Sequence, residues 1–580
     1  MAIAATVSGM ISRSRLLARG RDLMSGPPAP APTPARAPAA RAPGRIVALI
    51  AICAALPFAL TAIVVLARPD TFALRGDSAV IELAVRNAAE FAQHLGPYSR
   101  FGWTHPGPLW FYALVPIYVL GGETAASLLA SVEFLNAVCC VLIVLAAARR
   151  RVGPAVGAAA AVLIFTLTAP SAVFAEIWNP YATVLPALLF LVLLARAADG
   201  SALFLLGALI VGSFLVQTHL GTALPVFACV IAVVLFIAVS RAPRFLRRLR
   251  SSWPRIRRSR ALAGLAAGAV LVAVWIPPLQ DQLRGTRNLT AIARFLKAAH
   301  KIGTGHTAVQ GVVLIERLAV PPSWSIDMVS VLRPPPVSAA VPCGLCGFVL
   351  VNVAIGVVAR RRGARTATYI AALAVLLVPL GIAAVVQIDG NLHNYLIVWF
   401  LAAPAATVLA ACLLLAEVRF RTLPHSRAFV QVGPALVATL LLLAGTVTAV
   451  LVPRAGHSAD CCTQNDILAA DRSLLAAAGT PSRGGAPINI RYDVNGEWPL
   501  ATALAASLAE HGWSPRLPAA AAGLFRLPAS GDDPHDPTVP TVWIQSGTEQ
   551  RLRGYHVVAR VPGVAMWQSG GFVGIVEFRR

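Results

Sequence analysis

Apolar stretches of about 20 residues recur along this chain, and each is long enough to cross the hydrocarbon core of a bilayer. Hydrophobic residue types make up 57% of the chain and charged types 13%. Soluble domains have roughly 45–50% and about 25%. The sequence therefore predicts an integral membrane protein, most of whose length forms a single helical bundle.

The formal net charge of +24 would also suit a nucleic-acid-binding protein. Its distribution argues against one, because the arginines gather in short segments between apolar runs, and no RNA- or DNA-binding motif accompanies them. Positive charge in such segments sets membrane topology, since basic loops stay on the cytoplasmic side. We therefore expect membrane lipids as surroundings and no nucleic-acid partner.

Four basic runs fix the direction of the spans, and they lie at 149–151, 241–260, 360–362 and 419–427. With all four inside, the apolar runs between them predict about eleven transmembrane helices, a cytoplasmic N-terminus and an outward C-terminus. The predicted spans are 45–66, 124–148, 154–170, 181–197, 201–217, 222–240, 261–278, 338–358, 367–388, 395–416 and 428–452.

Three regions follow from this pattern. Residues 1–44 are rich in proline and arginine and predict a disordered cytoplasmic tail, whereas 45–452 form the transmembrane domain. Residues 453–580 alternate short strand-like runs with glycine and proline, around one helical segment at about 499–511, and predict a small outward-facing α/β domain. The expected strands are 488–492, 541–545, 555–561 and 574–578.

Two predicted outward loops, 67–123 and 279–337, are too long to be simple connections, and long loops are usually functional. The first is expected to hold an amphipathic helix and then an apolar helix, 109–120, too short to span and suited to the outer interface. The second is expected to hold a helix near Asn288–Ala299 and ends in three consecutive prolines at 334–336.

Polar residues that topology does not explain gather on this outward side. The densest group lies in the first loop, where Asp77 opens a helix and the string 96–108 mixes Arg100, His105 and three aromatic rings with glycine and proline. Such rigid, irregular backbone commonly positions a functional site. Asp77 also suits the helix N-cap, a role compatible with chemistry. Glu82, Arg86 and Glu90 have the spacing of a solvated salt-bridge ladder.

Further polar groups lie at predicted outer helix ends. Glu176 and Asn179 join the third and fourth spans, His219 ends the fifth, and His393 lies between the ninth and tenth. Each alone is typical of a capping or interhelical hydrogen bond. If these ends lie at one membrane level, together they predict a polar cavity.

The order of these motifs resembles the GT-C superfamily of membrane glycosyltransferases, in particular its protein O-mannosyltransferase-like branch. The number of spans and the outward C-terminal domain also resemble actinobacterial arabinofuranosyltransferases. The motifs that carry the resemblance over about 45–240 are Gly76-Asp77-Ser78-Ala79, His105-Pro106-Gly107-Pro108-Leu109-Trp110-Phe111-Tyr112, Gly121-Gly122-Glu123 and Arg149-Arg150-Arg151.

The resemblance implies a multi-pass enzyme of the cell membrane that moves a sugar, with inversion, from a polyprenyl-phosphate donor to a glycan, lipid or protein acceptor outside the cell. The family's loop-one acid maps onto Asp77, which would act as general base. The departing phosphate needs positive charge or a metal. Residues expected to bind substrate are Arg75, Arg100, His105, Asn179, His219 and His393.

The chain departs from the family pattern at two positions. Ser78 stands where relatives have the second acid of an Asp-Glu pair, and Asn179 stands where they often have an acid near the fourth span. These departures put a divalent ion such as Mg²⁺ or Mn²⁺ in doubt, and Glu176, one turn earlier, is its candidate ligand.

Two other function classes remain open at this stage. A lipid or polysaccharide transporter would place polar groups along a path through the bilayer, yet few charges lie in mid-span. A non-catalytic GT-C relative would act as a scaffold in envelope assembly. In the C-terminal domain, Trp498, Trp513, Trp543 and Trp567 suit either sugar stacking or a hydrophobic core.

Overall fold

The computed structural model describes the chain in segments. They are 42–169, 172–249, 258–299, 305–320, 343–422, 464–481, 484–492, 498–519, 523, 525, 538–546, 554–564 and 571–579. Three sequence predictions lie outside these residues: the N-terminal tail up to 41, the prolines at 334–336 and the eleventh span at 428–452.

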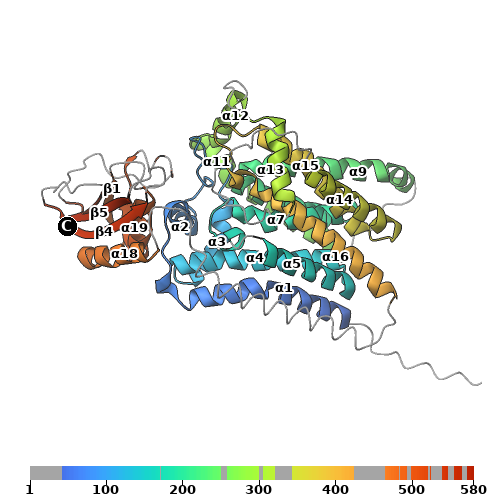
Figure 1. Cartoon of the computed structure of the whole chain (residues 1–580), viewed down its shortest axis with the longest axis horizontal. Helices are drawn as coiled ribbons and strands as arrows, with labels where there is room; N and C mark the ends of the chain where they lie inside the picture. The colour runs from blue at the N-terminus through green and yellow to red at the C-terminus, as the bar shows by residue number, and fades with distance from the viewer. Residues whose placement is uncertain are drawn as a thin grey trace, which may run out of the picture. The chain divides into compact units, whose positions relative to one another are not determined.

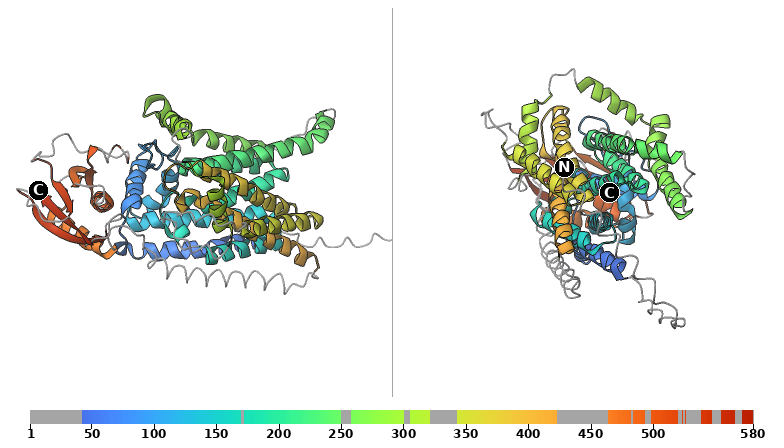
Figure 2. Two further views of the ribbon diagram at one scale, coloured as in Figure 1. Left: turned by 45° about the horizontal axis from the view of Figure 1, so that its top comes forward. Right: turned by 90° about the vertical axis from the view of Figure 1, so that its right-hand side faces the viewer.

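Long apolar helices that run side by side dominate the described residues (Figures 1 and 2). Eight of these helical segments are long and apolar enough to cross a membrane. The helices that form them are α1 (Ala42–Leu66), α4 (Ala125–Ala148), α7 (Val184–Ala198), α9 (Ala223–Leu249), α10 (Arg258–Ala273) with α11 (Ile276–Arg284), α14 (Cys343–Arg361), α15 (Arg365–Val386) and α16 (Ala402–Thr422). Three short 3-10 turns lead into α7, α9 and α16, namely η2 (Tyr181–Thr183), η3 (Leu220–Thr222) and η5 (Asn394–Leu401).

Helix α1 illustrates why these segments belong in a bilayer. Ile50, Ala54 and Phe58 are buried in the bundle, yet Leu49 and Ile52 on the same helix are 58% and 57% exposed. A helix that is apolar on its exposed face as well as its packed face suits hydrocarbon surroundings rather than water. The chain is a multi-pass α-helical membrane protein.

Each of the ten predicted spans that fall within the described residues coincides with a helix. Two of these helices, α5 (Val152–Thr168) and α8 (Ala202–Thr218), have 17 residues each. The predicted basic loop at 241–260 was wrong in part, because α9 continues to Leu249 and α10 already begins at Arg258. Long basic residues carry no intrinsic penalty in a helix, so their charge marks a membrane boundary without ending the helix.

The two long loops also contain the expected helices. The first holds η1 (Pro69–Thr71), the amphipathic α2 (Gly76–Ala89) and the apolar α3 (Leu109–Leu120), and the second holds α12 (Asn288–Ala299). The sequence did not predict α13 (Ala308–Ala319), which packs against α15, or the short α6 (Ala172–Ala175).

The C-terminal part is an α/β domain with a five-stranded sheet. The sheet order is β2-β1-β3-β5-β4, with β1 parallel to β2 and β3, and β5 antiparallel to β3 and β4. Its elements in chain order are α18 (Gln464–Ala478), β1 (Ala486–Tyr492), α19 (Trp498–Glu510), β2 (Trp513–Arg516), β3 (Thr541–Ser546), β4 (His556–Val564) and β5 (Gly571–Arg579). The sequence predicted α19 and four of these strands but missed α18 and β2.

One hydrophobic cluster crosses from this domain to the first loop. Val80 and Leu83 of α2 pack in the same cluster as Leu500 and Leu504 of α19. Each fully buried aliphatic side chain of this kind contributes about 1.5–3 kcal/mol. The loop helix that begins next to Asp77 is therefore held by the C-terminal domain.

Candidate active site

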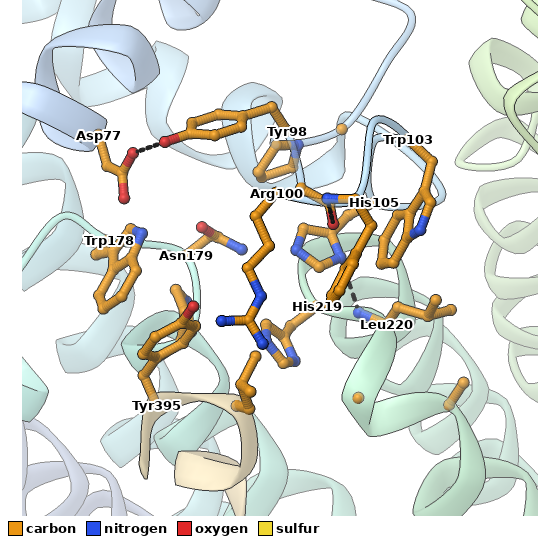
Figure 3. A pocket seen from close by; sticks show the side chains of 18 of the residues that line it. Asp77, Tyr98, Arg100, Trp103, His105, Trp178, Asn179, His219, Leu220 and Tyr395 are labelled. Atoms are coloured by element: carbon orange, nitrogen blue, oxygen red, sulfur yellow. Dashed lines mark hydrogen bonds between the residues drawn. The ribbon is translucent and has the colours of Figure 1, made fainter. Parts of the chain in front are cut away.

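A cavity of about 260 Å³ lies where loop segments and helix ends from six parts of the chain meet. The lining residues whose chemistry matters include Asp77, Tyr98, Arg100, Trp103, His105, Trp178, Asn179, His219 and Tyr395 (Figure 3). Asp389 and Phe525 also line the cavity. The predicted meeting of polar groups from distant helix ends therefore exists, although the sequence did not show which of them would meet.

The segment from Gly96 to His105 folds back on itself to form one wall. The N–H of His105 donates to the carbonyl of Pro97 at 2.7 Å, and Tyr98 pairs with Thr104 in an antiparallel bridge. A Cβ on Gly96 would lie 2.5 Å from the carbonyl oxygen of Gly107, so only glycine permits this close approach. The fold-back places Tyr98, Arg100 and His105 on one short stretch that faces the cavity.

A side chain from the second long loop locks this stretch. The Oδ1 of Asn288 accepts from the N–H of Thr104 at 2.9 Å, and its Nδ2 donates to the carbonyl of the same residue at 2.8 Å. This amide mimics a neighbouring β-strand, and Asn288 is buried. The wall is thus rigid before any ligand arrives.

Asp77 lies in the first turn of α2, where the partial positive charge of the helix terminus favours a carboxylate. The N-cap position belongs to Arg75, which makes no side-chain capping bond, so the alternative role of Asp77 as N-cap is wrong. The carboxylate instead accepts a hydrogen bond from the phenol of Tyr98 (Figure 3). Asp77 therefore lines the cavity with a fixed orientation.

Arg100 extends from the folded stretch into the cavity, toward His219 and Tyr395 (Figure 3). Its guanidinium donates to the backbone carbonyls of Asn391 at 2.7 Å and Asp389 at 3.2 Å. Because both acceptors are neutral, the positive charge is available to an anion in the cavity. A guanidinium has five N–H donors, so such a site matches a phosphate well.

His105 and His219 form a buried pair, with ring centroids 5.0 Å apart. The N–H of Leu220 donates to the Nδ1 of His105 at 3.0 Å, so the neutral ring carries its proton on Nε2. Burial lowers the pKa of His105 well below its usual value, with a smaller effect from His219, and burial lowers the pKa of His219 to about 4. Both rings are therefore neutral hydrogen-bonding groups at neutral pH.

The other predicted site residues have different places. Asn179 lines the cavity, and its Nδ2 donates to the carbonyl of Thr218 at 2.9 Å, which leaves its carbonyl oxygen for a ligand. Arg75, Glu176 and His393 are not among the lining residues, although His393 stacks on the lining Tyr395 at 5.3 Å.

None of the phenylalanine, tyrosine or tryptophan residues that line the cavity was selected from the sequence as a site residue. Tyr98 lies within the string 96–108 described above, and Trp178 and Tyr395 lie close in sequence to the predicted site residues Asn179 and His393. The rings of Trp178 and Tyr395 lie 4.5 Å apart. Phe525 belongs to the C-terminal domain, and no sequence signal linked it to the first loop. Aromatic faces beside polar groups are well suited to a sugar ring.

The described residues do not form an assembled site for a divalent metal ion. In the segments that the structure describes, no three His, Cys, Asp or Glu side chains are grouped as a metal would require. The candidate ligand Glu176 does not line the cavity beside Asp77. No step below runs through a metal.

The predicted salt-bridge ladder on α2 was wrong in part: the ion pair between Glu82 and Arg86 forms, but it is not solvated. Glu82 is fully buried rather than solvated, and it accepts from Arg86 at 3.2 Å and from the hydroxyl of Tyr118 at 2.8 Å. Burial, followed by the nearby carboxylate of Glu510, raises the pKa of Glu82. The spacing alone could not show that α3 and the C-terminal domain cover this face of α2.

No protein-family model and no curated protein sequence matches this chain. Among solved structures, it is similar to ArnT from Cupriavidus metallidurans bound to undecaprenyl phosphate, with 15% identity, 90% of this chain and 97% of that chain covered, and a TM-score of 0.47. It is also similar to the Archaeoglobus fulgidus oligosaccharyltransferase in complex with Zn and sulfate, with 14% identity, 79% and 61% covered, and a TM-score of 0.36. With TM-scores below 0.5, neither similarity identifies the reaction of this chain.

Proposed function

We propose that this protein transfers a sugar from a polyprenyl-phosphate donor to a hydroxyl group of a glycan, lipid or protein acceptor on the outer face of the cell membrane. The observation that carries the proposal is a single cavity lined by the carboxylate of Asp77 and the guanidinium of Arg100. This pairing supplies one group for each charge that the reaction develops.

The proposed reaction is a direct displacement with inversion. Asp77 takes the proton of the acceptor hydroxyl while its oxygen attacks the anomeric carbon of the donor. The bond between that carbon and the phosphate oxygen breaks, and the polyprenyl phosphate leaves with the bonding electron pair. Arg100 and the Nε2–H of His105 stabilise the negative charge that grows on this phosphate.

The size of the cavity supports a small polar head as its occupant. Its volume of about 260 Å³ lies below the roughly 300–1,000 Å³ of pockets for drug-sized ligands. A sugar phosphate suits such a space, whereas the polyprenyl chain would remain in the bilayer. In this proposal the cavity, the helix ends around it and the C-terminal domain face the outside of the cell.

The test uses the purified full-length protein in lipid nanodiscs, with a panel of radiolabelled polyprenyl-phosphate monosaccharides and extracted envelope glycans as acceptors. The wild type should release polyprenyl phosphate from one donor of the panel, and Asp77→Asn should abolish the release. Asp466→Asn is the matched control, because Asp466 also lies in the first turn of a helix, α18, outside the cavity lining.

Failure of every donor with the wild type would overturn the proposal, and so would an Asp77→Asn variant that is as active as the wild type. If the protein moved the intact donor across the bilayer without releasing phosphate, the transporter hypothesis would replace it. If the Asp77→Asn variant complemented a strain lacking the protein, a non-catalytic scaffold role would replace the proposed transfer reaction.

A further inference from the structure

Two aromatic residues of the C-terminal domain contact the surroundings of Asp77. Trp498 is the first residue of α19, and a Cβ on Gly76, the residue before Asp77, would lie 3.4 Å from its ring. Phe525 lines the cavity and packs edge-on against Tyr98, with ring centroids 4.9 Å apart and an angle of 74°. Tyr98 in turn donates its hydrogen bond to the Asp77 carboxylate.

The two aromatic residues also contact each other. The rings of Trp498 and Phe525 lie 5.4 Å apart. Gly76 has a φ of +52°, a conformation that glycine adopts without strain and that other residues rarely do. The backbone beside Asp77 and the phenol that faces its carboxylate are therefore held by one continuous aromatic group, formed by Trp498, Phe525 and Tyr98.

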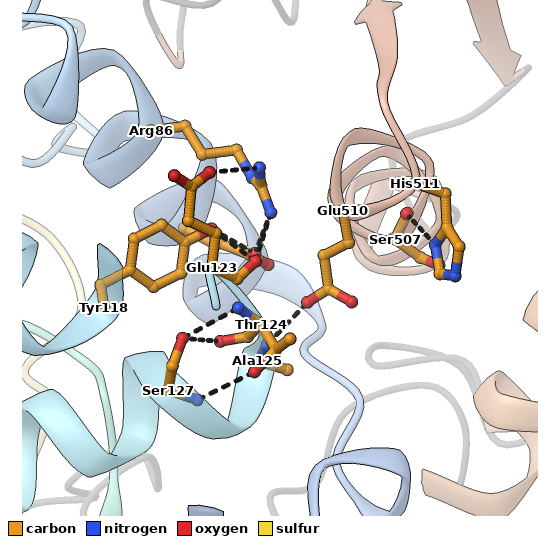
Figure 4. Close-up of polar contacts among 10 residues, drawn as sticks. Arg86, Tyr118, Glu123, Thr124, Ala125, Ser127, Ser507, Glu510 and His511 are labelled. Atoms are coloured by element: carbon orange, nitrogen blue, oxygen red, sulfur yellow. Dashed lines mark hydrogen bonds and ion pairs between the residues drawn. The ribbon is translucent and has the colours of Figure 1, made fainter. Parts of the chain in front are cut away.

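Helix α19 gives this group a rigid support, because the helix is fixed along its length. At its C-terminal end, the Oε1 of Glu510 accepts from the N–H of Ala125, the first residue of α4, at 2.6 Å (Figure 4). Between the ends, its leucines share the hydrophobic cluster with Val80 and Leu83 of α2. A general base must be oriented accurately for proton transfer, because small misplacements reduce reaction rates strongly. A rigid support such as α19 therefore favours catalysis.

We infer that Phe525 is a positioning residue for the reaction: it fixes Tyr98, whose phenol orients the Asp77 carboxylate, so the C-terminal domain sets the geometry of the base. This inference rests on the proposed function. It assigns the C-terminal domain a part in catalysis through a named contact, separate from any binding of acceptor.

A double-mutant cycle tests the contact through activity. Phe525→Ala should lower kcat about 10-fold with little change in the KM for the donor, and Phe525→Tyr, which keeps the ring, should restore most of the rate. In a Tyr98→Phe background, Phe525→Ala should change kcat by less than about 2-fold, because the route through the phenol is already lost.

The matched control is Phe578→Ala, which removes a ring from the same domain's core but not from the cavity lining. It should lower the melting temperature at least as much as Phe525→Ala, yet reduce kcat by less and by the same factor in both backgrounds. An equal loss of kcat from Phe525→Ala with and without the Tyr98 hydroxyl would overturn the inference.

Hydrogen exchange tests the same contact without any substrate. In Phe525→Ala, the amides of 76–80 and 98–105 should exchange faster than in the wild type, whereas Phe578→Ala should leave them unchanged. Unchanged exchange in both segments of Phe525→Ala would overturn the inference even if transfer were established. If no donor were used by the wild type, the proposed function would fail while this measurement still reported on the contact.

Discussion

The two ends of the helical bundle place a carboxylate in different surroundings, a closed cluster of arginines at one end and an open cavity at the other. At the arginine-rich end, Asp199 follows α7, its side chain is 3% exposed, and it pairs with Arg149, with Arg196 at 3.4 Å and with Arg365 at 3.7 Å. At the other end, Asp77 lines a cavity and accepts a hydrogen bond from the neutral phenol of Tyr98. In the proposed orientation, which follows the positive-inside rule, the arginine-rich end faces the cytoplasm.

The difference shows that surroundings decide what a carboxylate does. Asp199 joins three elements of the bundle, because its charge is surrounded by guanidinium groups and closed to substrates. Asp77 is fixed by a helix terminus and a phenol, which orient it and still leave it beside open space. We therefore expect replacement of Asp199 to lower the stability of the fold and replacement of Asp77 to lower the rate of sugar transfer. The following predictions test this difference.

The largest expected effect is on transfer. Asp77→Asn should lower kcat by about 10²–10⁴-fold, the usual range for loss of a general base, while the melting temperature in detergent stays within 2–3 °C or so of the wild type. Release of radiolabelled polyprenyl phosphate and a thermal-shift assay measure the two quantities. A variant that unfolds but keeps its specific activity would reverse the roles of the two ends.

The second prediction compares two arginines. Arg100→Lys should lower kcat/KM for the donor about 10–100-fold, because an ammonium cannot hold two backbone carbonyls and a phosphate in the fork geometry of a guanidinium. Arg149→Lys, the same change at the arginine-rich end, should leave kcat/KM unchanged. Equal losses in both variants would mean that Arg100 acts through stability alone.

A third prediction concerns stability. Asp199→Asn should lower the free energy of unfolding by roughly 1–3 kcal/mol, less than the 3–5 kcal/mol of a fully buried ion pair, because two of its three arginine partners reach solvent. The enzyme that remains folded should keep its kcat. Melting curves in detergent and the transfer rate of the folded protein are the two measurements. A loss of kcat in the folded Asp199→Asn variant would contradict the prediction.

The smallest expected effect is a pH dependence that belongs to the cavity end alone. The pKa of His219 falls from 6.5 to about 4 in the folded chain, and the pKa of His105 is lowered as well, so the unfolded chain binds protons that the folded chain does not. Stability is therefore full above about pH 6.5 and declines as the pH falls toward 4. His219→Gln should flatten this decline in melting temperature, and His511→Gln, which changes an exposed histidine of the C-terminal domain, should not. If the melting temperature of His219→Gln fell with pH as steeply as that of the wild type, groups other than His219 would cause the decline.

Hydropathy and charge predicted the spans well because they reflect the solvent around each helix. The bilayer imposes a length and a polarity on every crossing, and both are visible residue by residue. Prediction failed where partners from elsewhere in the chain changed the surroundings. Glu82 was expected to be solvated, but it is buried and accepts a hydrogen bond from Tyr118. Helix α18 was missed because its apolar residues are buried only by packing with the rest of the C-terminal domain.

By itself, the sequence determined a multi-pass helical bundle, an α/β domain after it, and a first loop that contains Asp77 and the string 96–108 with Arg100 and His105, because these properties follow from local composition and order. Only the tertiary structure decided that His219, Asn179 and Tyr395 meet that string in one cavity, and that Phe525 packs against Tyr98 from more than 400 residues away. Such contacts depend on how whole helices and a domain pack together, and no short stretch of sequence carries that information.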